Sequence, residues 1–429
     1  MNQPSVCIIG AGCSGITAVK NLIEAGFTKV TCFEQNSDVG GNWIYSPKVS
    51  HSSVSETTHI ISSKKMSEFR DFPMPDSYPD YPSHEQVLAY FRSYARHFDV
   101  YSFIQFNIKV EHVEKTEQDK WMVTLGDGTS RIFDYILISN GHHSVPRHPE
   151  LPGKFDGEYL HSHSFKTNKP FKDKRVLVIG AGNSGCDCAV ESSRVAQYVA
   201  LSMRSPQYIV PKFFNGKPVD TYNSQMSWLP DLVKRILLKG TLKLQVGSYS
   251  DYNLPEPDFP VTKSHPTLNS ELLYKIRHGK VHPKSAIKEI NGKTVTFSDG
   301  QSEDFDVIIA ATGYKIALPF FDSDFINYEE AERIPLYLRM FHPEHPTLVF
   351  IGLVQPQGAI WPLSDYQSLL AAGYMSGRWS LPKNVAQLAE NEADVIAKEF
   401  LPHKRHSVEV HYHSYLRSLK KHIRSFYRE

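Results

Sequence analysis

Two copies of one glycine pattern constrain this chain more than any other feature. Residues 10–15 read Gly-Ala-Gly-Cys-Ser-Gly, and residues 180–185 read Gly-Ala-Gly-Asn-Ser-Gly. Each copy follows a short apolar run and precedes a helical pattern, which predicts a strand, a tight turn and a helix. In such a turn the first glycine makes the bend, the second lets the backbone approach a pyrophosphate, and the third lets the helix pack on the strand. One copy could serve packing alone, but two copies predict two nucleotide-binding domains.

The first copy opens a complete nucleotide-binding unit. We expect a strand at 6–9, a helix at about 16–25 and a second strand at 29–33. Glu34 ends that strand, nineteen residues beyond Gly15. Dinucleotide-binding folds place there the carboxylate that accepts hydrogen bonds from an adenosine ribose. The first copy therefore predicts a site for a nucleotide with an unphosphorylated ribose.

The second copy carries the opposite charge at the equivalent place. Its second strand, at 197–203, ends in Arg204, which again lies nineteen residues beyond the last glycine of the turn. A guanidinium there suits a 2′-phosphate, which it can bind through two hydrogen bonds. We therefore expect the second domain to prefer NADPH over NADH. The alternative is a strand-end charge that faces only solvent.

A further turn follows the first unit, where Gly40 and Gly41 precede Asn42 and Trp43. Paired glycines allow close backbone approach, and a tryptophan offers a flat apolar face. A contact with a ring-shaped ligand is one interpretation. A turn whose tryptophan caps the core is the other.

Composition and charge favour a small molecule as partner. Among 429 residues, 47 Lys plus Arg nearly balance 46 Asp plus Glu, so no net field indicates nucleic acid or an acidic membrane. The sequence has no run of about 18 apolar residues that would predict a transmembrane helix, and Met1 to Pro4 leads into the first strand without a signal peptide. The five cysteines do not form a disulfide framework. We expect reduced thiols in a cytoplasmic protein.

Two long stretches have no sustained period. Residues 54–81 are rich in Ser, Thr, Pro and aromatic residues, and we expect an ordered excursion over the surface. Residues 206–285 are irregular except for a short amphipathic helix at 228–246 with a basic run. A membrane-surface role is one interpretation of that helix, but packing on the core or on a dimer partner is favoured.

Three histidines, His142, His143 and His148, crowd one loop between the two units. They have no partners at a known ligand spacing, so we expect a polar interdomain loop and no metal site. The tail at 384–429 alternates charged and apolar residues, which predicts surface helices.

A pattern shortly before the second glycine turn gives the two-domain chain a family resemblance. Phe155, Gly157, His161 and Phe165 read Phe-x-Gly-x-x-x-His-x-x-x-Phe, and with both turns this resembles the flavin-containing monooxygenases, whose hallmark it is. The resemblance covers nearly the whole chain, in residues 10–15, Glu34, 41–43, 72–73, 141–143, 180–187, 311–314 and 351–355.

The resemblance implies an α/β fold with two dinucleotide-binding, Rossmann-like domains. It implies an FAD-binding domain at 1–150 and 311–429, into which an NADP-binding domain at 151–310 is inserted, with an irregular insertion at about 206–285. The implied FAD residues are Gly10, Ala11, Gly12, Cys13, Ser14, Gly15, Glu34, Gln35, Gly41, Asn42, Trp43 and Gln355. The implied NADP residues are Gly180, Gly182, Asn183, Ser184, Gly185, Cys186, Asp187, Arg204 and Ser205. The hallmark residues would couple the two domains.

The resemblance also implies the chemistry. NADPH reduces FAD, O₂ adds at flavin C4a, and the hydroperoxide transfers one oxygen atom to a soft nitrogen or sulfur nucleophile, an amine or a sulfide. The protein positions the cofactors and excludes water, so we assign no catalytic acid, base or nucleophile. A homodimer is implied as well. The alternatives are an NADPH oxidase or a Baeyer–Villiger-type enzyme, and a sensor that binds FAD and NADP without turning over an organic substrate.

The chain departs from the family in three places. Counting without gaps places Ile61 and Ser62 where well-known members carry a flavin-contacting Asn. The hydrophobic C-terminal anchor of vertebrate microsomal members is absent, which indicates a soluble, bacterial-type form. The middle stretch at 206–285 has no motif that can be matched residue by residue. These departures leave the substrate unassigned.

Overall fold

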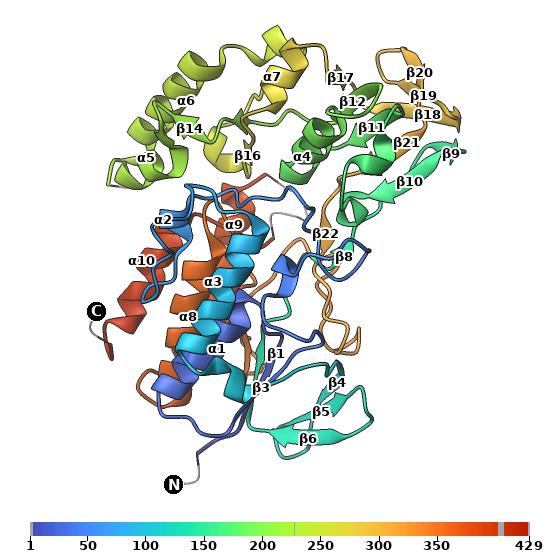
Figure 1. Cartoon of the computed structure of the whole chain (residues 1–429). Helices are drawn as coiled ribbons and strands as arrows, with labels where there is room; N and C mark the ends of the chain where they lie inside the picture. Colours follow the sequence, from blue (N-terminus) through green and yellow to red (C-terminus); the bar gives the residue numbers. More distant parts are fainter. Residues whose placement is uncertain (1–2, 227, 402–406, 428–429) are drawn as a thin grey trace. The chain divides into compact units, whose positions relative to one another are not determined.

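The computed structural model describes residues 3–226, 228–401 and 407–427 of the chain. It divides into two compact units (Figure 1). The first comprises residues 1–44, 62–145 and 315–429, and the second comprises residues 45–61 and 146–314. The second unit is therefore made from two insertions into the first.

A parallel sheet of five strands, in the order β23-β7-β1-β2-β3, forms the centre of the first unit. Its strands are β1 (Val6–Ile9), β2 (Val30–Phe33), β3 (Ile104–Gln105), β7 (Tyr135–Ile138) and β23 (Leu348–Phe350). The strands β1 and β23 are buried along their whole length, which explains why they read as continuous apolar runs rather than as alternating ones.

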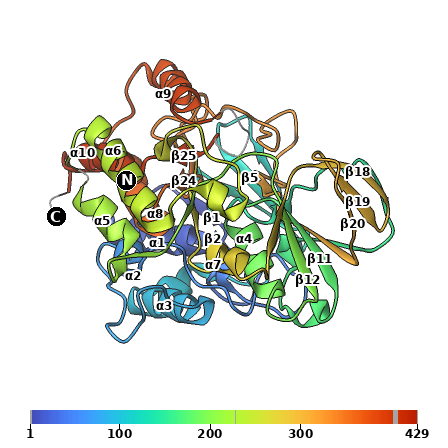
Figure 2. The ribbon, with the colours of Figure 1, turned by 90° about the horizontal axis from the view of Figure 1, so that it is seen from above.

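Three helices of the first unit pack against one another beside this sheet (Figures 1 and 2). They are α1 (Cys13–Glu24), α3 (His84–His97) and α8 (Ile360–Met375). A capping box between Ser83 and Gln86 fixes the start of α3. The helix α8 is buried around almost its whole circumference, so its small and polar residues face protein rather than water.

The remaining elements of the first unit surround this layer. They are η1 (Gly41–Trp43), α2 (Lys64–Ser67), η2 (Val100–Phe103), the antiparallel sheet of β4 (Val110–Lys115), β5 (Trp121–Leu125) and β6 (Ser130–Phe133), the parallel pair β24 (Gln355–Pro356) and β25 (Glu409–Val410), α9 (Val385–Glu399) and α10 (Tyr412–Ile423). The two-residue strands β8 (Val145–Pro146) and β22 (Tyr314–Lys315) lie where the chain crosses between units.

The second unit has its own parallel sheet of five strands, in the order β10-β21-β11-β12-β17. These are β10 (Glu158–His161), β11 (Arg175–Ile179), β12 (Tyr198–Ser202), β17 (His282–Lys284) and β21 (Val307–Ala310), and α4 (Asn183–Ser192) follows β11. A four-stranded sheet contains β9 (Gly153–Phe155), β18 (Ile287–Gly292), β19 (Thr294–Phe297) and β20 (Ser302–Asp304).

The stretch at 206–285 is more helical than its sequence predicts. It contains α5 (Val219–Gln225), α6 (Asp231–Val246) and α7 (Leu272–Arg277), besides η5 (Tyr249–Tyr252), η6 (Val261–Lys263), the strand pair β13 (Ile209–Val210) and β16 (Thr267–Leu268), and the pair β14 (Phe213–Phe214) and β15 (Lys217–Pro218). Elements this short do not repeat often enough to produce a visible period. The 3-10 turns η3 (Ser162–Ser164) and η4 (Lys169–Phe171) lie between β10 and β11.

Both glycine turns close in the same way. A Cβ atom on Gly15 would lie 1.8 Å from the carbonyl oxygen of Gly10, and one on Gly185 would lie 1.8 Å from that of Gly180. The first glycine of each turn has a positive φ, +97° at Gly10 and +100° at Gly180. Only glycine allows the helix to start this close to the end of the strand.

This geometry predicts that Gly185→Ala destabilises the protein by roughly 1–3 kcal/mol or more, because the methyl group forces the helix away from the strand. Gly182→Ala is the matched control, since a Cβ there meets nothing within 4 Å. The control should cost no more than about 1 kcal/mol. Thermal unfolding of the two variants measures the difference, and equal midpoints would contradict the packing argument.

Candidate cofactor sites

The first glycine turn leaves the start of α1 open to a phosphate. Gly12 is the N-cap, no side chain caps the helix, and its first turn has no acidic residue. The unpaired N–H groups and the positive end of the helix dipole therefore favour an anion. Ala11 follows Gly10 in the turn, while Cys13, Ser14 and Gly15 form the first turn of α1, so the helix begins earlier than the apolar pattern predicts.

Glu34 lies at the end of β2, beside this turn. The carboxylate is 4% exposed, and its Oε2 accepts a hydrogen bond from the backbone N–H of Ala11 at 2.6 Å. Its Oε1 accepts from the backbone N–H of Asn36 at 2.9 Å. Glu34 thus faces the glycine turn, whereas the next residue, Gln35, is exposed.

The turn at Gly41, Asn42 and Trp43 packs over the first glycine turn. The backbone N–H of Gly40 donates to the Ala11 carbonyl at 3.0 Å, and a Cβ on Gly12 would lie 3.7 Å from the Cα of Gly41. The indole of Trp43 meets that of Trp361 edge to face, with ring centroids 5.5 Å apart. Trp43 therefore packs on α8, as its core-capping interpretation expects, while its side chain stays half-buried.

The strand β23 leads to a turn that lies against the start of α1. A Cβ on Gly352 would approach the hydroxyl of Ser14 to 2.1 Å. Gln355 follows in β24, and its Oε1 lies 3.2 Å from Nε2 of His142. Burial lowers the pKa of His142, so this ring is neutral at pH 7. This turn brings the segment 351–355 to the first glycine turn.

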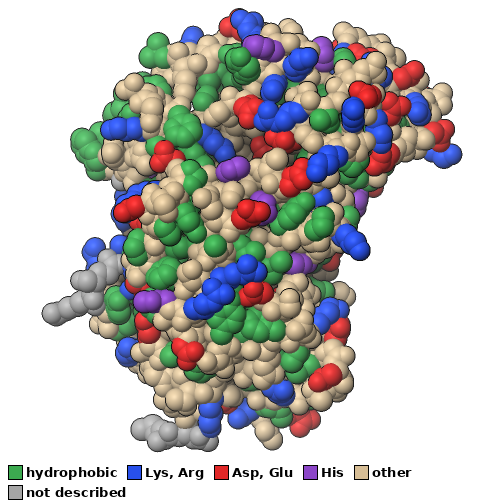
Figure 3. All heavy atoms as spheres, viewed as in Figure 1, with side chains coloured by type: hydrophobic (Ala, Val, Ile, Leu, Met, Phe, Trp, Pro, Cys, Tyr) green, Lys and Arg blue, Asp and Glu red, His purple; other side chains and the backbone are tan. Residues whose placement is uncertain are grey.

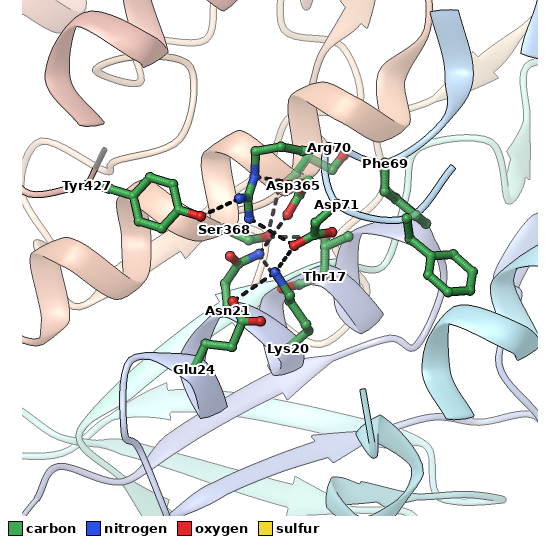
Figure 4. Close-up of polar contacts among 12 residues, drawn as sticks. Thr17, Lys20, Asn21, Glu24, Phe69, Arg70, Asp71, Asp365, Ser368 and Tyr427 are labelled. Carbon is green, nitrogen blue, oxygen red and sulfur yellow. Dashed lines mark hydrogen bonds and ion pairs between the residues drawn. The ribbon is translucent and has the colours of Figure 1, made fainter. Parts of the chain in front are cut away.

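A network of charged side chains, absent from the sequence expectations, joins three distant segments of the first unit (Figure 4). Lys20 on α1 pairs with Glu24 at 2.8 Å and also with Asp71. Arg70 lies 3.4 Å from the carboxylate of Asp365 on α8, and it donates to the hydroxyl of Tyr427 at 2.7 Å. Charges this far apart in the chain leave no local pattern, which is why sequence analysis missed them.

Asp365 is the deepest member of this network. Its side chain is 0% exposed, and Nδ2 of Asn21 donates to its Oδ1 at 2.8 Å. Burial raises the pKa of Asp365, while Arg70 and Asn21 limit the rise. Two pairs of hydroxyl groups also connect α1 and α8. The Ser364 and Ser14 hydroxyl oxygens lie 3.1 Å apart, and those of Ser368 and Thr17 lie 3.2 Å apart. The helix that starts at the glycine turn is therefore fastened to α8 by polar contacts.

The second glycine turn repeats the open helix start. Gly182 is the N-cap of α4, without a side-chain cap or an acidic residue in the first turn. Oδ1 of Asn183 accepts from the backbone N–H of Leu268 at 2.8 Å, and Asp187 accepts from Asn269 at 2.8 Å. Ser184 is exposed, while Gly185 and Cys186 are buried beneath the turn.

Arg204 and Ser205 lie just beyond β12, and both are exposed. Within the described residues the Arg204 guanidinium has no hydrogen bond or ion pair with the protein. Its charge is therefore available to a ligand, although the same observation fits a solvated strand-end charge.

The four hallmark residues all lie in the second unit. Phe155 ends β9, Gly157 sits where a Cβ would come 2.6 Å from the Asp306 carbonyl oxygen, and His161 ends β10. Phe165 is 4% exposed and stacks on Phe171, with ring centroids 5.3 Å apart. The hallmark residues thus lie in and around β10, the first strand of the second parallel sheet along the chain.

His161 is a buried, neutral hydrogen-bond donor. It is 2% exposed, and burial followed by the neighbouring His148 and His163 lowers its pKa to about 4, which a backbone contact with Gly313 partly offsets. Its Nδ1 accepts from the backbone N–H of His163 at 3.1 Å, so the proton resides on Nε2. That Nε2 has no partner within hydrogen-bonding geometry among the described residues.

Residues 45–61 belong to the second unit, which the sequence did not predict. Nζ of the buried Lys166 donates to the carbonyls of Ser52 and Val54, the latter at 3.3 Å. Nε2 of His163 lies 2.6 Å from the Ser50 carbonyl oxygen, and Lys212 donates to that of Ile60 at 3.2 Å. Burial lowers the pKa of Lys166 to about 8.

Ile61 and Ser62, where the family resemblance led us to expect an Asn, lie at a crossing point of the chain. Ile61 is the last residue of this inserted segment, and Ser62 is the first residue back in the first unit. The Ser62 hydroxyl lies 2.8 Å from that of Ser67 on α2. Neither residue has a side-chain amide.

Other features of the described chain bear on partners. It contains no group of three or more His, Cys, Asp or Glu side chains placed to hold a metal ion. All five cysteines are free. Within the same residues, none of the helices combines the length and apolar character that crossing a membrane requires. On the face drawn in Figure 3, basic and acidic side chains are interspersed with one another.

Comparisons with known proteins agree on one family. The family model described as flavin-binding monooxygenase-like matches residues 3–426. The mouse protein "Flavin-containing monooxygenase 5" is 37% identical over 435 aligned positions, which span 96% of this chain and 81% of that protein. The rabbit "Dimethylaniline monooxygenase [N-oxide-forming] 2" is 34% identical, over 90% of this chain and 76% of that protein.

A solved structure supports the same relationship. The S-allyl-L-cysteine S-oxygenase of Allium sativum superimposes with a TM-score of 0.75 at 25% identity, over 98% of this chain and 89% of that one. Together with the two sheets and their glycine turns, this confirms the predicted α/β fold with two dinucleotide-binding domains.

The charge network predicts that Arg70→Met destabilises the protein by about 3–5 kcal/mol, because the substitution leaves Asp365 buried without its cation. Since the pKa of folded Asp365 is already raised, the loss should be larger at pH 8, where the carboxyl must ionise, than at pH 5. Lys65→Met is the control, because Lys65 is 75% exposed and its pair with Glu68 contributes less than about 1 kcal/mol. Equal losses for both variants in thermal unfolding would show that the network does not stabilise the fold.

Proposed function

The chain belongs to the flavin-binding monooxygenase-like family, and from that premise we propose that it is an FAD- and NADPH-dependent monooxygenase acting on a soft nitrogen or sulfur nucleophile. The overall reaction consumes one NADPH, one proton and one O₂ and yields NADP⁺, water and the oxygenated substrate. The observation that carries the proposal is the pair of open helix starts, each closed by the same glycine contact, within a chain that matches the family from residue 3 to 426.

The first unit has the features that FAD needs. The uncapped start of α1 can receive the pyrophosphate, and the absence of an acidic residue in its first turn avoids repulsion. Glu34 is held beside that turn and can accept the ribose hydroxyls, while Gly41, Asn42, Trp43 and Gln355 lie on segments packed against it. When bound, FAD supplies the redox and oxygen-transfer chemistry.

The second unit has the corresponding features for NADPH. The start of α4 is open in the same way, and the exposed Arg204 and Ser205 lie at the end of the neighbouring strand, where a 2′-phosphate would be bound. The domain assignment, with NADPH in residues 151–310, is part of this proposal.

The protein's own part in the reaction is to bind and orient, and no side chain is assigned as acid, base or nucleophile. The names of the rabbit relative and of the Allium sativum enzyme record N-oxide formation and S-oxygenation, which support the two substrate classes. The chain has Ile61 and Ser62 where the family resemblance leads us to expect an Asn. The reaction of the reduced enzyme with O₂ in the absence of an organic substrate must therefore also be measured.

Localisation and assembly complete the proposal. We infer a cytoplasmic protein, which the five free thiols support because that compartment keeps thiols reduced. A homodimer is proposed on the family resemblance, and sedimentation velocity of the purified holoenzyme tests it.

The reaction is tested with the purified holoenzyme, O₂ and NADPH, in the presence of a thioether such as methyl phenyl sulfide or a tertiary amine such as N,N-dimethylaniline. We expect sulfoxide or N-oxide in amounts that match the NADPH consumed. Hydrogen peroxide equal to the NADPH consumed, with no oxygenated product, would indicate an oxidase. In a parallel assay with cyclohexanone, a lactone as the main product would indicate a Baeyer–Villiger enzyme. No NADPH oxidation with any of these substrates would indicate a sensor.

Arg204 provides a separate prediction. Arg204→Ala should lower the NADPH-to-NADH ratio of kcat/KM by about 10- to 100-fold, because hydrogen bonds to a charged group contribute about 1.5–3 kcal/mol. Lys288→Ala removes an exposed cation from β18 of the same unit and should leave the ratio unchanged. An unchanged ratio in Arg204→Ala would assign that residue to the solvent-exposed surface alone.

A further inference from the structure

Three consecutive residues of the stretch at 206–285 donate hydrogen bonds to the second glycine turn and to the helix behind it. They are Thr267, Leu268 and Asn269, which we call the clasp. The hydroxyl of Thr267 donates to the Ala181 carbonyl oxygen at 2.9 Å. The next two residues donate to the side chains of Asn183 and Asp187 on α4, each at 2.8 Å. The strand β16, which contains the first two clasp residues, lies beside α4 in the second unit (Figure 1).

The clasp is fixed in place at both of its ends. Its first residue, Thr267, is 1% exposed, and its backbone N–H donates to the Tyr208 carbonyl oxygen at 2.8 Å beside the paired strands β13 and β16. At the other end, Oδ1 of Asn269 accepts from the backbone N–H of Leu272 at 2.7 Å, where α7 begins. The Thr267 hydroxyl therefore contacts the turn from a rigid support.

The Thr267 hydrogen bond determines which way one peptide group of the turn faces. The carbonyl and the N–H of a planar trans peptide point in opposite directions. Because the Ala181 carbonyl faces Thr267, the N–H of Gly182 faces away from it, and among the described residues this N–H has no hydrogen-bond partner. Gly182 has no Cβ to oppose a rotation of this peptide. The Cys186 thiol also lies 3.4 Å from the same carbonyl oxygen, but a thiol is a weak donor, so Thr267 is the main restraint.

A different donor binds the equivalent carbonyl of the first turn. Ala11 occupies the place of Ala181, and its carbonyl oxygen accepts from the backbone N–H of Gly40 at 3.0 Å. Two segments that differ in sequence and structure thus restrain the same peptide group, which indicates that the turn requires this orientation. Only in the second turn is the donor a side chain, so only there can a substitution remove it.

The second clasp residue orients the Asn183 amide. Asn183 is half-buried at the first position of α4, and its Oδ1 accepts from the Leu268 backbone N–H. A backbone N–H can only donate, so this contact identifies the amide oxygen and leaves the NH₂ group on the other side. Within the described chain that NH₂ group has no partner. The start of α4 therefore carries a side-chain donor besides its unpaired backbone N–H groups.

We propose that Thr267 is a positioning residue for the pyrophosphate of the nicotinamide cofactor. It keeps the Gly182 N–H turned towards the pyrophosphate, while Leu268 leaves the Asn183 amide free to donate to the same group. This inference rests on the proposed NADPH site in the second unit. Because NADPH and NADH share the pyrophosphate, the clasp raises the affinity for both cofactors, whereas the proposed role of Arg204 is to discriminate between them.

Isothermal titration of the FAD-loaded holoenzyme with NADP⁺ tests the inference without measuring turnover. Thr267→Val keeps the shape of the side chain and removes the hydroxyl. We expect it to bind NADP⁺ about tenfold more weakly, because a misaligned N–H loses a hydrogen bond to a charged group. Thr267→Ser retains the hydroxyl and should bind NADP⁺ like the wild type. The NADPH-to-NADH ratio of kcat/KM should stay unchanged in Thr267→Val, in contrast to its fall in Arg204→Ala.

Tyr208→Phe is the matched control, because it removes another hydroxyl from a buried residue of the same stretch. The Tyr208 hydroxyl donates to the Phe259 carbonyl oxygen at 2.6 Å rather than to the turn. This variant and Thr267→Val should lower the midpoint of thermal unfolding by similar amounts, but Tyr208→Phe should bind NADP⁺ normally. Equal weakening of NADP⁺ binding in both variants would assign the effect to lost stability and overturn the inference.

The remaining outcomes separate this inference from the proposed function. If Thr267→Val binds NADP⁺ as tightly as the wild type, or if Thr267→Ser binds it as weakly as Thr267→Val, the role of Thr267 is wrong while the proposed function stands. A wild-type holoenzyme that does not bind NADP⁺ would refute the proposed function itself.

Discussion

The rest of the structure depends on the close contact, in each glycine turn, between the third glycine and the carbonyl oxygen of the first glycine. Because no Cβ intervenes, α1 and α4 begin directly against the ends of β1 and β11. Their open N–H groups then stand at the carboxyl ends of the parallel strands, beside the residues that end the neighbouring strands. Glu34 contacts one turn in this way, and Arg204 lies just beyond the end of β12, the strand next to the other turn. One backbone arrangement, used twice, thus places an acidic residue beside the first turn and a basic residue just after the strand next to the second.

Helix packing beside the first turn depends on polar contacts more than is usual for a core. The faces of α1 and α8 meet through hydroxyl pairs, an amide-to-carboxylate hydrogen bond and the charges of Lys20, Arg70 and Asp365. Such contacts have direction, whereas apolar contacts tolerate sliding. The neighbours of α1 therefore fix the rotation of this helix about its axis. The buried charges therefore fit a positional role better than a simple gain in stability.

Elements with a repeating or alternating apolar pattern could be predicted from the sequence. Contacts between residues that lie far apart in the chain could not. The strand at 6–9 was predicted with the bounds that the structure has, because its apolar pattern is strong. The helix after the first turn begins at Cys13 rather than Ile16, because the small residues of the turn are themselves helical. The helices α5 and α7 were missed because they are too short to show a period. The candidate residues of each turn could be named from spacing alone, but not Asn269 beside Asp187 or Ser364 beside Ser14, which lie far away in the chain.

The assignment of residues 45–61 to the second unit has a consequence for building chimeras from relatives. An exchange of residues 146–314 alone would leave this segment behind, and the new unit would have to present equivalents of Lys166, His163 and Lys212 to carbonyl groups from a different parent. The exchangeable module is therefore discontinuous and requires four junctions rather than two. Recombination that respects only the linear boundary would break a set of hydrogen bonds that no alignment of the glycine motifs reveals.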